Sequence, residues 1–143
     1  MDGAPALSCV LVDDNEPMLA ALETLLREEG IDVIGTAVTG LDALRLLEQR
    51  QPTALVVDVR LPDLTGIEVA RRARELAQLR PAVIVYTSYA DRSVVSRALD
   101  AGARAVVLKD APPVNLLEAI SVVAAGGMYV DPRLRTGPDR RGA

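Results

Sequence analysis

Five short apolar runs, rich in β-branched residues, recur along the chain and constrain its fold more than any other feature. They are the segments 8–13, 32–38, 54–59, 82–87 and 104–109. Near-continuous apolar runs of this length are typical of strands that are buried on both faces of a parallel sheet. Their starts lie 22 to 28 residues apart, so each gap can hold one helix and two loops.

The gaps have helical periodicity and helical start and stop signals. The first opens near Pro17 and ends at Gly30, and the last two open with Asp or Pro and end with Gly. The apolar positions expected on the buried helix faces are Leu19, Leu22, Leu25, Leu26, Leu41, Leu44, Leu47, Ile67, Ala70, Ala73 and Leu76.

Strands that alternate with helices predict an α/β fold built from parallel β–α units. Five units are few for a closed barrel, so we expect a doubly wound five-stranded sheet in three α/β/α layers. Right-handed connections favour the flavodoxin-like strand order 2-1-3-4-5.

The length of 143 residues suits one domain. We expect a short N-terminal extension at 1–6, the domain at 7–130, and a disordered tail rich in Arg, Pro and Gly at 131–143. The tail's arginines come without aromatic residues, so DNA binding is not expected of it. No apolar run is long enough for a membrane span, and the start lacks a basic signal region, which favours a cytoplasmic protein.

The composition removes several classes of function. The chain has no His, so Ser-His-Asp and Cys-His catalysis and most zinc sites are excluded. It has no Phe or Trp for stacking on single-stranded nucleic acid, and the net charge of -4 argues against a broad phosphate-binding surface. The single cysteine, Cys9, excludes an internal disulfide.

Polar residues stand at the carboxyl ends of four predicted strands. Asp13 and Asp14 end the first, Asp58 the third, Thr87 the fourth and Lys109 the fifth. Open parallel sheets bind ligands outside these ends, where the strand order reverses. We therefore expect the three carboxylates to share one crevice, with Thr87 and Lys109 on its far rim.

Three carboxylates in one crevice repel one another unless a proton or a cation intervenes. A set of oxygen ligands without His or Cys suits Mg²⁺. With Lys109 as a second positive charge and the Thr87 hydroxyl as a donor, the arrangement fits phosphoryl transfer, and Asp58 is the candidate nucleophile.

Each of these residues also has an ordinary structural interpretation. Asp13 and Asp14 could cap a helix, Asp58 could belong to a turn, Thr87 could simply end a strand, and Lys109 could be a solvated charge. What these interpretations leave unexplained is the placement of all five at the same end of their strands.

The chain resembles the receiver domains of bacterial two-component response regulators over roughly residues 7 to 130. The matching segments are V-L-V-D-D-N, V-V-D-V-R-L-P-D-L-T-G, V-Y-T-S and D-A-G-A-R-A-V-V-L-K-D. The resemblance implies that Asp58 is the phosphoacceptor, that Asp14 binds Mg²⁺ directly, and that Asp13 does so through water. It further implies a metal contact from the Arg60 backbone carbonyl.

The resemblance also assigns Thr87 as the switch hydroxyl and Lys109 as the phosphate-pairing lysine. It implies a sensor histidine kinase as the donor and a signalling surface on the fourth and fifth helices. It further implies an output partner that the sequence does not reveal, possible dimerisation on phosphorylation, and slow autodephosphorylation rather than dedicated catalysis.

The D-V-R-L-P-D-L-T-G and G-G-M-Y-V-D-P-R-L forms resemble the NarL/FixJ subgroup. Members usually continue into a LuxR-type DNA-binding domain, but only nine residues follow here, so we expect a stand-alone receiver or a fragment. Val106 replaces the usual aromatic residue three positions before the lysine, and Tyr89 is considered as a substitute that closes over the site.

Two other functions stay open. A haloacid-dehalogenase-type phosphatase would need D-x-D, whereas this strand reads D-V-R with Arg60 at the second position. A pseudo-receiver would bind partners without accepting phosphate, and the complete set of site residues argues against it.

Overall fold

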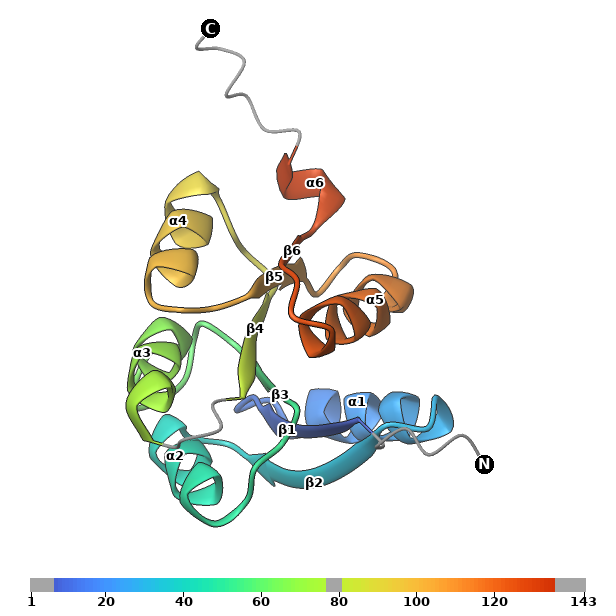
Figure 1. Ribbon diagram of the computed structural model, residues 1–143, viewed down its shortest axis with the longest axis vertical. Coiled ribbons are helices and arrows are strands. Elements are labelled where there is room, and N and C mark those ends of the chain that lie inside the picture. Colours follow the sequence, from blue (N-terminus) through green and yellow to red (C-terminus); the bar gives the residue numbers. More distant parts are fainter. Residues whose placement is uncertain (1–6, 77–80, 136–143) are drawn as a thin grey trace, which may run out of the picture.

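The structure is a computed structural model, which describes residues 7–76 and 81–135. Strands and helices alternate along these residues (Figure 1). The strands are β1 (Ser8–Val12), β2 (Asp32–Ala37), β3 (Ala54–Val57), β4 (Ala82–Thr87), β5 (Ala105–Leu108) and β6 (Tyr129–Val130). The helices are α1 (Glu16–Glu28), α2 (Gly40–Gln49), α3 (Gly66–Leu76), α4 (Arg92–Asp100), α5 (Pro113–Ala124) and α6 (Pro132–Arg135).

The strands form one parallel sheet in the order β2-β1-β3-β4-β5-β6. The predicted α/β class and the predicted order of the first five strands are confirmed. The predicted count of five is short by one, because β6 pairs with β5 through Ala105↔Tyr129 and Val106↔Val130. Three residues lie between Gly-Gly and Asp-Pro, and two of them form β6. This run is too short for hydrophobic periodicity to identify as a strand.

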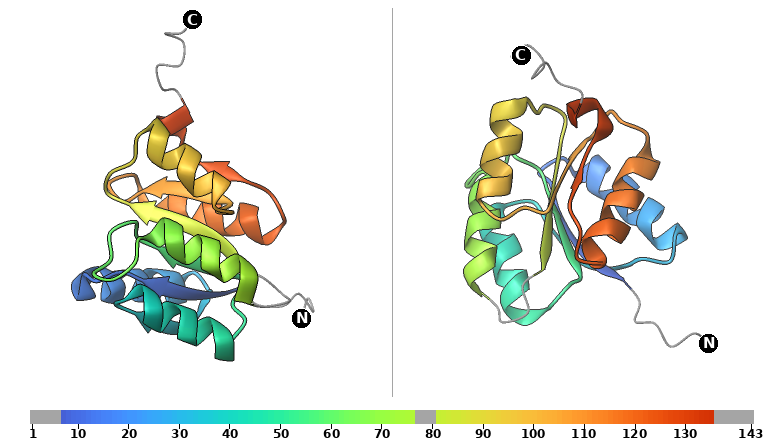
Figure 2. Two further views of the ribbon diagram at one scale, coloured as in Figure 1. Left: turned by 90° about the vertical axis from the view of Figure 1, so that its left-hand side faces the viewer. Right: turned by 45° about the horizontal axis from the view of Figure 1, so that its top comes forward.

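Helices cover both faces of the sheet, which gives the predicted three layers (Figure 2). Helices α1 and α5 lie on one face, and α2, α3 and α4 lie on the other (Figure 1). Because side chains alternate along a strand, Leu11 packs with the first group of helices and Val10 with the second. Strands β1 to β5 thus each contribute to two apolar cores.

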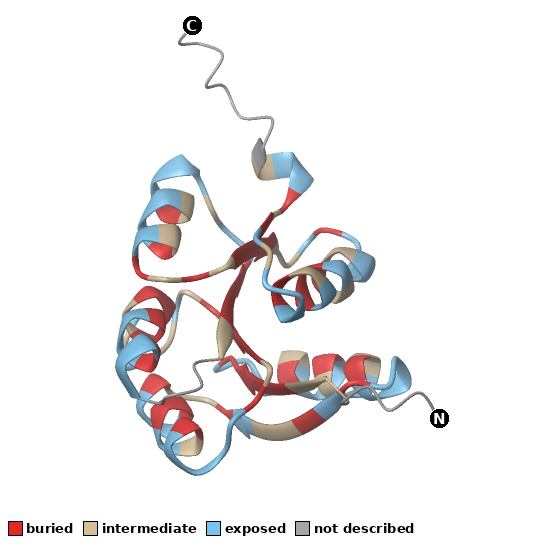
Figure 3. Cartoon of the chain, in the orientation of Figure 1, coloured by how far each residue is buried: buried red, intermediate tan, exposed pale blue. Residues whose placement is uncertain are grey.

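Two of the residues predicted on buried helix faces are exposed. Leu41 is 46% exposed and Leu76 is 39% exposed. Leu41 lies in the first turn of α2 and Leu76 is the last residue of α3, so helical spacing alone overestimates burial at helix ends. Figure 3 shows the buried residues along the inner sides of the helices.

The edge strand β2 has two backbone carbonyls that accept hydrogen bonds from arginine side chains. Arg27 donates to Val33 O at 3.1 Å, and Arg50 donates to Ile34 O at 2.7 Å. Carbonyls at a sheet edge otherwise face water or another strand. These side chains therefore occupy part of the hydrogen-bonding capacity of that edge.

The folded chain continues past the predicted boundary at residue 130. Asp131 is completely buried, its N–H donates to Val106 O at 2.9 Å, and α6 follows directly. The prediction of a disordered tail from 131 is therefore wrong for 131–135, because a carboxylate can be buried when backbone donors surround it. The rest of the predicted tail, 136–143, and the predicted extension at 1–6 lie outside the described residues. Among the described helices, none has the length and apolarity needed to cross a membrane.

Candidate functional site

Three carboxylates meet where β1 and β3 end. The two strands are neighbours in the sheet, with Val12 paired to Val57, so the residues that follow them come out side by side. One carboxylate oxygen from each of Asp13, Asp14 and Asp58 lies within 4.8 Å of the others. The predicted convergence at the switch point of the sheet is present in the structure.

The Lys109 ammonium lies among these carboxylates. Its Nζ donates to Asp58 Oδ2 at 2.8 Å and also to Asp13 Oδ2. All three side chains are largely buried, with exposed fractions of 11% for Lys109, 12% for Asp58 and 3% for Asp13. The expectation that Lys109 stands on the far rim is therefore wrong, because its long side chain reaches from the end of β5 across to β1 and β3.

The surroundings of Lys109 favour its charged form. Burial by itself would lower the pKa of Lys109, but the hydrogen bonds and the charges of Asp13 and Asp58 outweigh it and hold the pKa above the ordinary 10.5. The ammonium stays protonated at neutral pH. It offsets one of three negative charges, so the site keeps an excess of negative charge.

Asp13 and Asp14 do not cap α1. The cap is Asn15, whose side chain accepts from Met18 N at 3.1 Å. Asp13 Oδ1 accepts from Asn15 N at 2.9 Å, which holds the buried carboxylate against the start of the helix. Asp14 is exposed, so its carboxylate forms the solvent side of the cluster.

Thr87 is next to the site, and its hydroxyl bonds to backbone atoms rather than to the carboxylates. Its side chain is buried, and its hydroxyl lies 3.3 Å from both the N and the O of Tyr89. The backbone links it to the cluster, since Lys109 N donates to Thr87 O at 2.8 Å. Tyr89 itself is 61% exposed and its hydroxyl lies 3.5 Å from Asp91 Oδ2, so it does not close over the site.

The β3–α3 loop, residues 58–65, wraps tightly around Asp58. Arg60 N lies 3.4 Å from Asp58 Oδ1, and the Arg60 side chain is exposed. Gly66 N donates to Val59 O at 2.8 Å, and a Cβ on Gly66 would lie 2.1 Å from Asp58 O. Only glycine allows α3 to begin this close to the strand that carries Asp58.

Sequence reasoning missed the roles of two aspartates. Asp63 accepts from the backbone N–H groups of Gly40 at 2.8 Å and Leu41 at 2.9 Å, and so joins the β3–α3 loop to α2. Burial would raise its pKa, but these bonds, with a third from Leu64, lower it below the ordinary value. Asp131 accepts from Leu108 N at 3.2 Å. Both residues stand beside Pro in turn-like sequence, which gave no signal of a distant partner.

Val106, at the position where the resembled family often has an aromatic residue, is completely buried. It pairs with Val85 on one side and Val130 on the other, and it packs into the core beneath α2, α3 and α4. Its isopropyl group has little room to change orientation, so this position does not provide a ring that could turn between an inward and an outward state.

The site residues fit Mg²⁺ by their chemistry. All of the candidate ligands are oxygens, the chain contains no His, and one carboxylate oxygen from each aspartate lies within 4.8 Å of the others. The exposed Asp14 leaves a solvent side on which Mg²⁺ could retain water. The excess negative charge around Lys109 favours a divalent cation.

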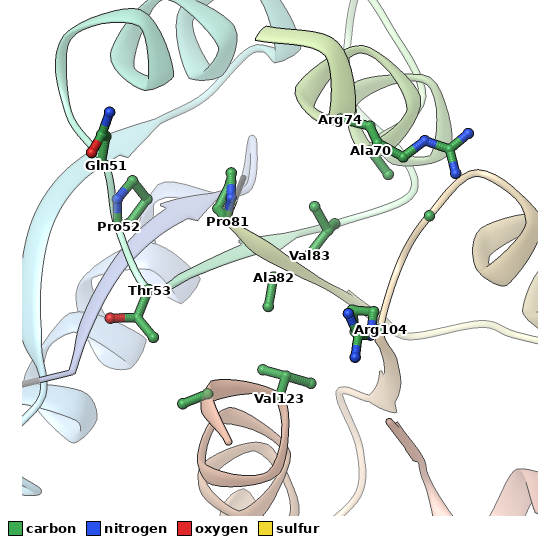
Figure 4. A pocket seen from close by; sticks show the side chains of 12 residues that line it. Gln51, Pro52, Thr53, Ala70, Arg74, Pro81, Ala82, Val83, Arg104 and Val123 are labelled. Atoms are coloured by element: carbon green, nitrogen blue, oxygen red, sulfur yellow. The ribbon is translucent and has the colours of Figure 1, made fainter. Parts of the chain in front are cut away.

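A cavity of about 490 Å³ lies at the amino ends of the strands, opposite the carboxylates (Figure 4). Its lining includes Thr53, Ala82 and Arg104, which stand at the amino ends of β3, β4 and β5, together with Arg74 of α3. Among the described residues, none that lines this cavity carries a carboxylate. The concentration of titratable side chains at the carboxyl ends, rather than the volume of this cavity, marks the candidate site.

Comparison with known proteins gives a consistent result. A family profile described as "Response regulator receiver domain" matches residues 9–121. The transcriptional regulatory protein DesR of Bacillus subtilis is 33% identical over 129 residues, which cover 90% of this chain and 63% of DesR. The transcriptional regulatory protein PdtaR of Mycobacterium tuberculosis is 35% identical over 118 residues, which cover 81% of this chain and 56% of PdtaR.

Solved structures agree in fold. A two-component response regulator of the LuxR family from Aurantimonas sp. SI85-9A1 superposes with a TM-score of 0.90 at 26% identity, covering 97% of this chain and all of that one. A CheY-like receiver domain protein from Methanospirillum hungatei gives a TM-score of 0.78 at 29% identity, covering 85% and 96% of the two chains. The chain therefore spans the whole of a receiver-sized structure but only about 60% of the curated relatives' length.

Proposed function

Since the chain belongs to the response regulator receiver domain family of two-component systems, we propose that its Asp58 carboxylate accepts a phosphoryl group from a sensor histidine kinase. The observation that carries this proposal is the contact of Lys109 with Asp58 and Asp13, beside the exposed Asp14. The Lys109 ammonium lies beside the Asp58 carboxylate. It therefore provides a fixed positive charge close to the position that the phosphoryl oxygens would take.

We propose that Asp13, Asp14 and Asp58 hold Mg²⁺, with the backbone carbonyl of Arg60 as a further ligand. The donor set supports this, because it consists of oxygens alone and carries an excess of negative charge. When bound, the ion would neutralise charge on a phosphoryl group during transfer.

In the proposed reaction, a carboxylate oxygen of Asp58 attacks phosphorus. The O–P bond forms as the P–N bond of a phosphohistidine breaks, and the electron pair of that bond returns to the imidazole of the kinase. The rigid end of β3 fixes the position of the nucleophile, which is where most of the rate of a phosphoryl transfer originates.

Lys109 would serve both states of the site. Before transfer it is paired with Asp58 Oδ2 and reduces the repulsion among the carboxylates. After transfer the phosphoryl group carries more negative charge than the carboxylate did, so the same ammonium would pair with a phosphoryl oxygen. The Thr87 hydroxyl, now directed to the Tyr89 backbone, is the donor that we expect to turn toward that group.

The partners follow from the family and from named relatives. DesR and PdtaR are named transcriptional regulatory proteins, and two solved relatives are described as LuxR family. We propose an output partner or segment that reads a surface on α4 and α5, a possible phosphorylation-dependent homodimer, and no sequence-specific DNA binding by residues 1–143 themselves. A cytoplasmic location, loss of phosphate by slow autodephosphorylation and a NarL/FixJ-type affiliation stay predictions.

The test is phosphorylation by acetyl phosphate, read by intact mass, with Mg²⁺ and with chelator. Wild type should gain one phosphoryl group only with Mg²⁺, and Asp58→Asn should gain none. A phosphorylated Asp58→Asn protein would show that another residue is the acceptor.

The same experiment separates the other two functions. A haloacid-dehalogenase-type phosphatase would turn the donor over many times instead of keeping the phosphoryl group, and Arg60, which is exposed and cannot act as a general acid and base, argues against it. A pseudo-receiver would remain unmodified with and without Mg²⁺.

A further inference from the structure

The β3–α3 loop carries a proposed metal ligand, the Arg60 carbonyl. Its apolar side chains Val59, Leu61 and Leu64 pack against the core, but few hydrogen bonds join it to other elements. At its ends it is fixed by β3 and by the bond from Gly66 N to Val59 O, 2.8 Å long. Thr65 at the end of the loop accepts from Glu68 N and Val69 N of α3, both at 3.0 Å. Within the described part of the chain, the hydrogen bonds that join residues 60–64 to another element are all accepted by the Asp63 side chain.

Those bonds cross a long distance in sequence. Asp63 Oδ1 accepts from Gly40 N at 2.8 Å and Oδ2 accepts from Leu41 N at 2.9 Å, over 23 and 22 residues. The two N–H groups belong to the first turn of α2, where no partner exists within the helix. The bidentate carboxylate therefore fixes both the position and the orientation of the loop.

The close packing beneath Asp63 restricts the conformations that the loop can adopt. Gly40 is buried, and a Cβ there would lie 2.9 Å from Val69 Cγ2 and 3.0 Å from Leu64 Cβ. The start of α2 thus touches both the loop and α3. Asp63 Oδ1 also accepts from Leu64 N at 2.7 Å, so the carboxylate orders its own side of the loop as well as α2.

We propose that Asp63 is a positioning residue for the phosphorylation site: it acts through the β3–α3 loop, and holds the Arg60 carbonyl where it can bind Mg²⁺, although Asp63 touches neither the metal ligands nor Asp58. This inference rests on the proposed function. Groups that orient metal ligands from outside the coordination sphere commonly contribute as much as tenfold or more to metal affinity.

The chain offers a matched control on the same helix. Thr39 is the residue before α2, and its hydroxyl accepts from Asp42 N at 3.1 Å. Thr39→Ala removes one capping bond from α2 without changing any bond of the β3–α3 loop. A loss of Mg²⁺ affinity that is due only to a less stable α2 should therefore appear both in Thr39→Ala and in the Asp63 variants.

The experiment measures Mg²⁺ binding by calorimetry on wild type, Asp63→Ala, Asp63→Asn and Thr39→Ala, without phosphodonor. We expect the Mg²⁺ dissociation constant to rise about tenfold in Asp63→Ala. We expect a smaller rise in Asp63→Asn, whose amide oxygen can keep one bond, and no change in Thr39→Ala. Hydrogen exchange of residues 59–65 should accelerate in the Asp63 variants only.

Phosphorylation by acetyl phosphate gives a second readout. The rate for Asp63→Ala should fall at low Mg²⁺ and return to that of wild type at saturating Mg²⁺, because the nucleophile itself is unchanged. Unchanged Mg²⁺ affinity in Asp63→Ala, or an equal loss in Thr39→Ala, overturns the inference. If Asp63→Ala does not fold, the Mg²⁺ affinity of Asp63→Asn is the deciding measurement: a value equal to that of wild type overturns the inference.

The inference and the proposed function fail in different ways. If wild type binds Mg²⁺ and is phosphorylated on Asp58 while the Asp63 variants match it, only the positioning role is wrong. If wild type neither binds Mg²⁺ nor accepts phosphate, the proposed function is wrong and the positioning role falls with it.

Discussion

The Lys109 ammonium lies 2.8 Å from a carboxylate oxygen of Asp58, although 51 residues separate the two in the chain. The same ammonium donates to Asp13, so one cation bridges the ends of β1 and β3. This relationship changes the electrostatic expectation for the site. The carboxylates do not face one another unshielded, and each substitution must be considered together with Lys109.

Replacing Asp58 with Asn should raise stability when no divalent cation is present. Three carboxylates surround one ammonium, and the substitution removes one negative charge while its amide oxygen can still accept from Lys109. We expect a gain in the free energy of unfolding of about 1 kcal/mol, since a pKa shift of one unit corresponds to ~1.4 kcal/mol. Urea unfolding with chelator measures it.

Millimolar Mg²⁺ should reduce that difference, because the ion stabilises wild type more than a variant with one ligand charge fewer. If Asp58→Asn is less stable than wild type in chelator, the bond to Lys109 outweighs the repulsion, and the excess charge is not what the cation compensates.

Replacing Lys109 with Met should destabilise the protein, because it leaves Asp13 and Asp58 buried without their cation. Removing one partner of a buried ion pair costs about 3 kcal/mol or more. Arg45→Met is the control, since it breaks an exposed pair with Asp42 and should cost about 0.5 kcal/mol or less.

The cost of Lys109→Met should depend on pH with a defined sign. The pKa of Lys109 is raised above 10.5 in the folded protein, so its stabilisation is complete below pH 10.5 and is lost as the pH rises through the folded value. Urea midpoints of wild type and variant should therefore converge above pH 10.5. A constant gap up to pH 11 and beyond would mean that the ammonium acts by packing and not by charge.

Replacing Gly66 with Ala should damage the site as well as the fold. The new Cβ would lie 2.1 Å from Asp58 O, so the backbone that carries the acceptor must move. We expect a loss of about 1–3 kcal/mol in stability and a phosphorylation rate lower by roughly 10- to 100-fold. Intact-mass time courses with acetyl phosphate and Mg²⁺ measure the rate.

Gly30→Ala is the control for this change. Gly30 has a φ of +81°, and no atom of the described residues lies within 4 Å of the position that a Cβ would take there. Alanine at this position should therefore cost about 1 kcal/mol of backbone strain. Its phosphorylation rate should equal that of wild type. Equal rates in Gly66→Ala and wild type would show that α3 can retreat without moving Asp58.

Replacing Asp131 with Ala should unfold the C-terminal edge of the sheet. Its buried carboxylate accepts from Leu108 N and Arg133 N, both at 3.2 Å, and both bonds would be lost. Leaving buried donors without an acceptor costs about 1–3 kcal/mol. Hydrogen exchange should accelerate at Leu108 and through α6, whereas Asp110→Ala, which removes an exposed pair with Arg133, should leave exchange at Leu108 unchanged.

The sequence predicted the sheet well because its strands are buried on both faces. An apolar run such as 54–59 has few alternatives to a central strand, and β3 occupies 54–57. It also predicted that the three carboxylates converge, because the carboxyl ends of parallel strands lie at the same end of the sheet. It did not predict β6, because two residues leave no periodic pattern, and it placed Lys109 too far away, because the reach of a long side chain depends on its rotamer.

The aspartates missed by sequence reasoning have a shared cause. Asp63 and Asp131 stand in loops beside Pro, where Asp is common for purely local reasons. Their partners, Gly40 and Leu108, are 23 residues away in each case and are backbone groups. Backbone donors are available at every position, so no feature of the sequence marks which of them a loop carboxylate will bind.

The arginine side chains that donate to the backbone of β2 affect the tendency of the protein to self-associate at high concentration. Open parallel sheets can grow by adding a strand from another molecule, and the free acceptors of an edge strand are the template for that growth. Arg27 and Arg50 occupy Val33 O and Ile34 O at one edge, and β6 at the other edge has only two residues. Both edges are therefore poor templates for strand pairing between molecules. Substituting both arginines by Met should therefore increase static light scattering as protein concentration rises.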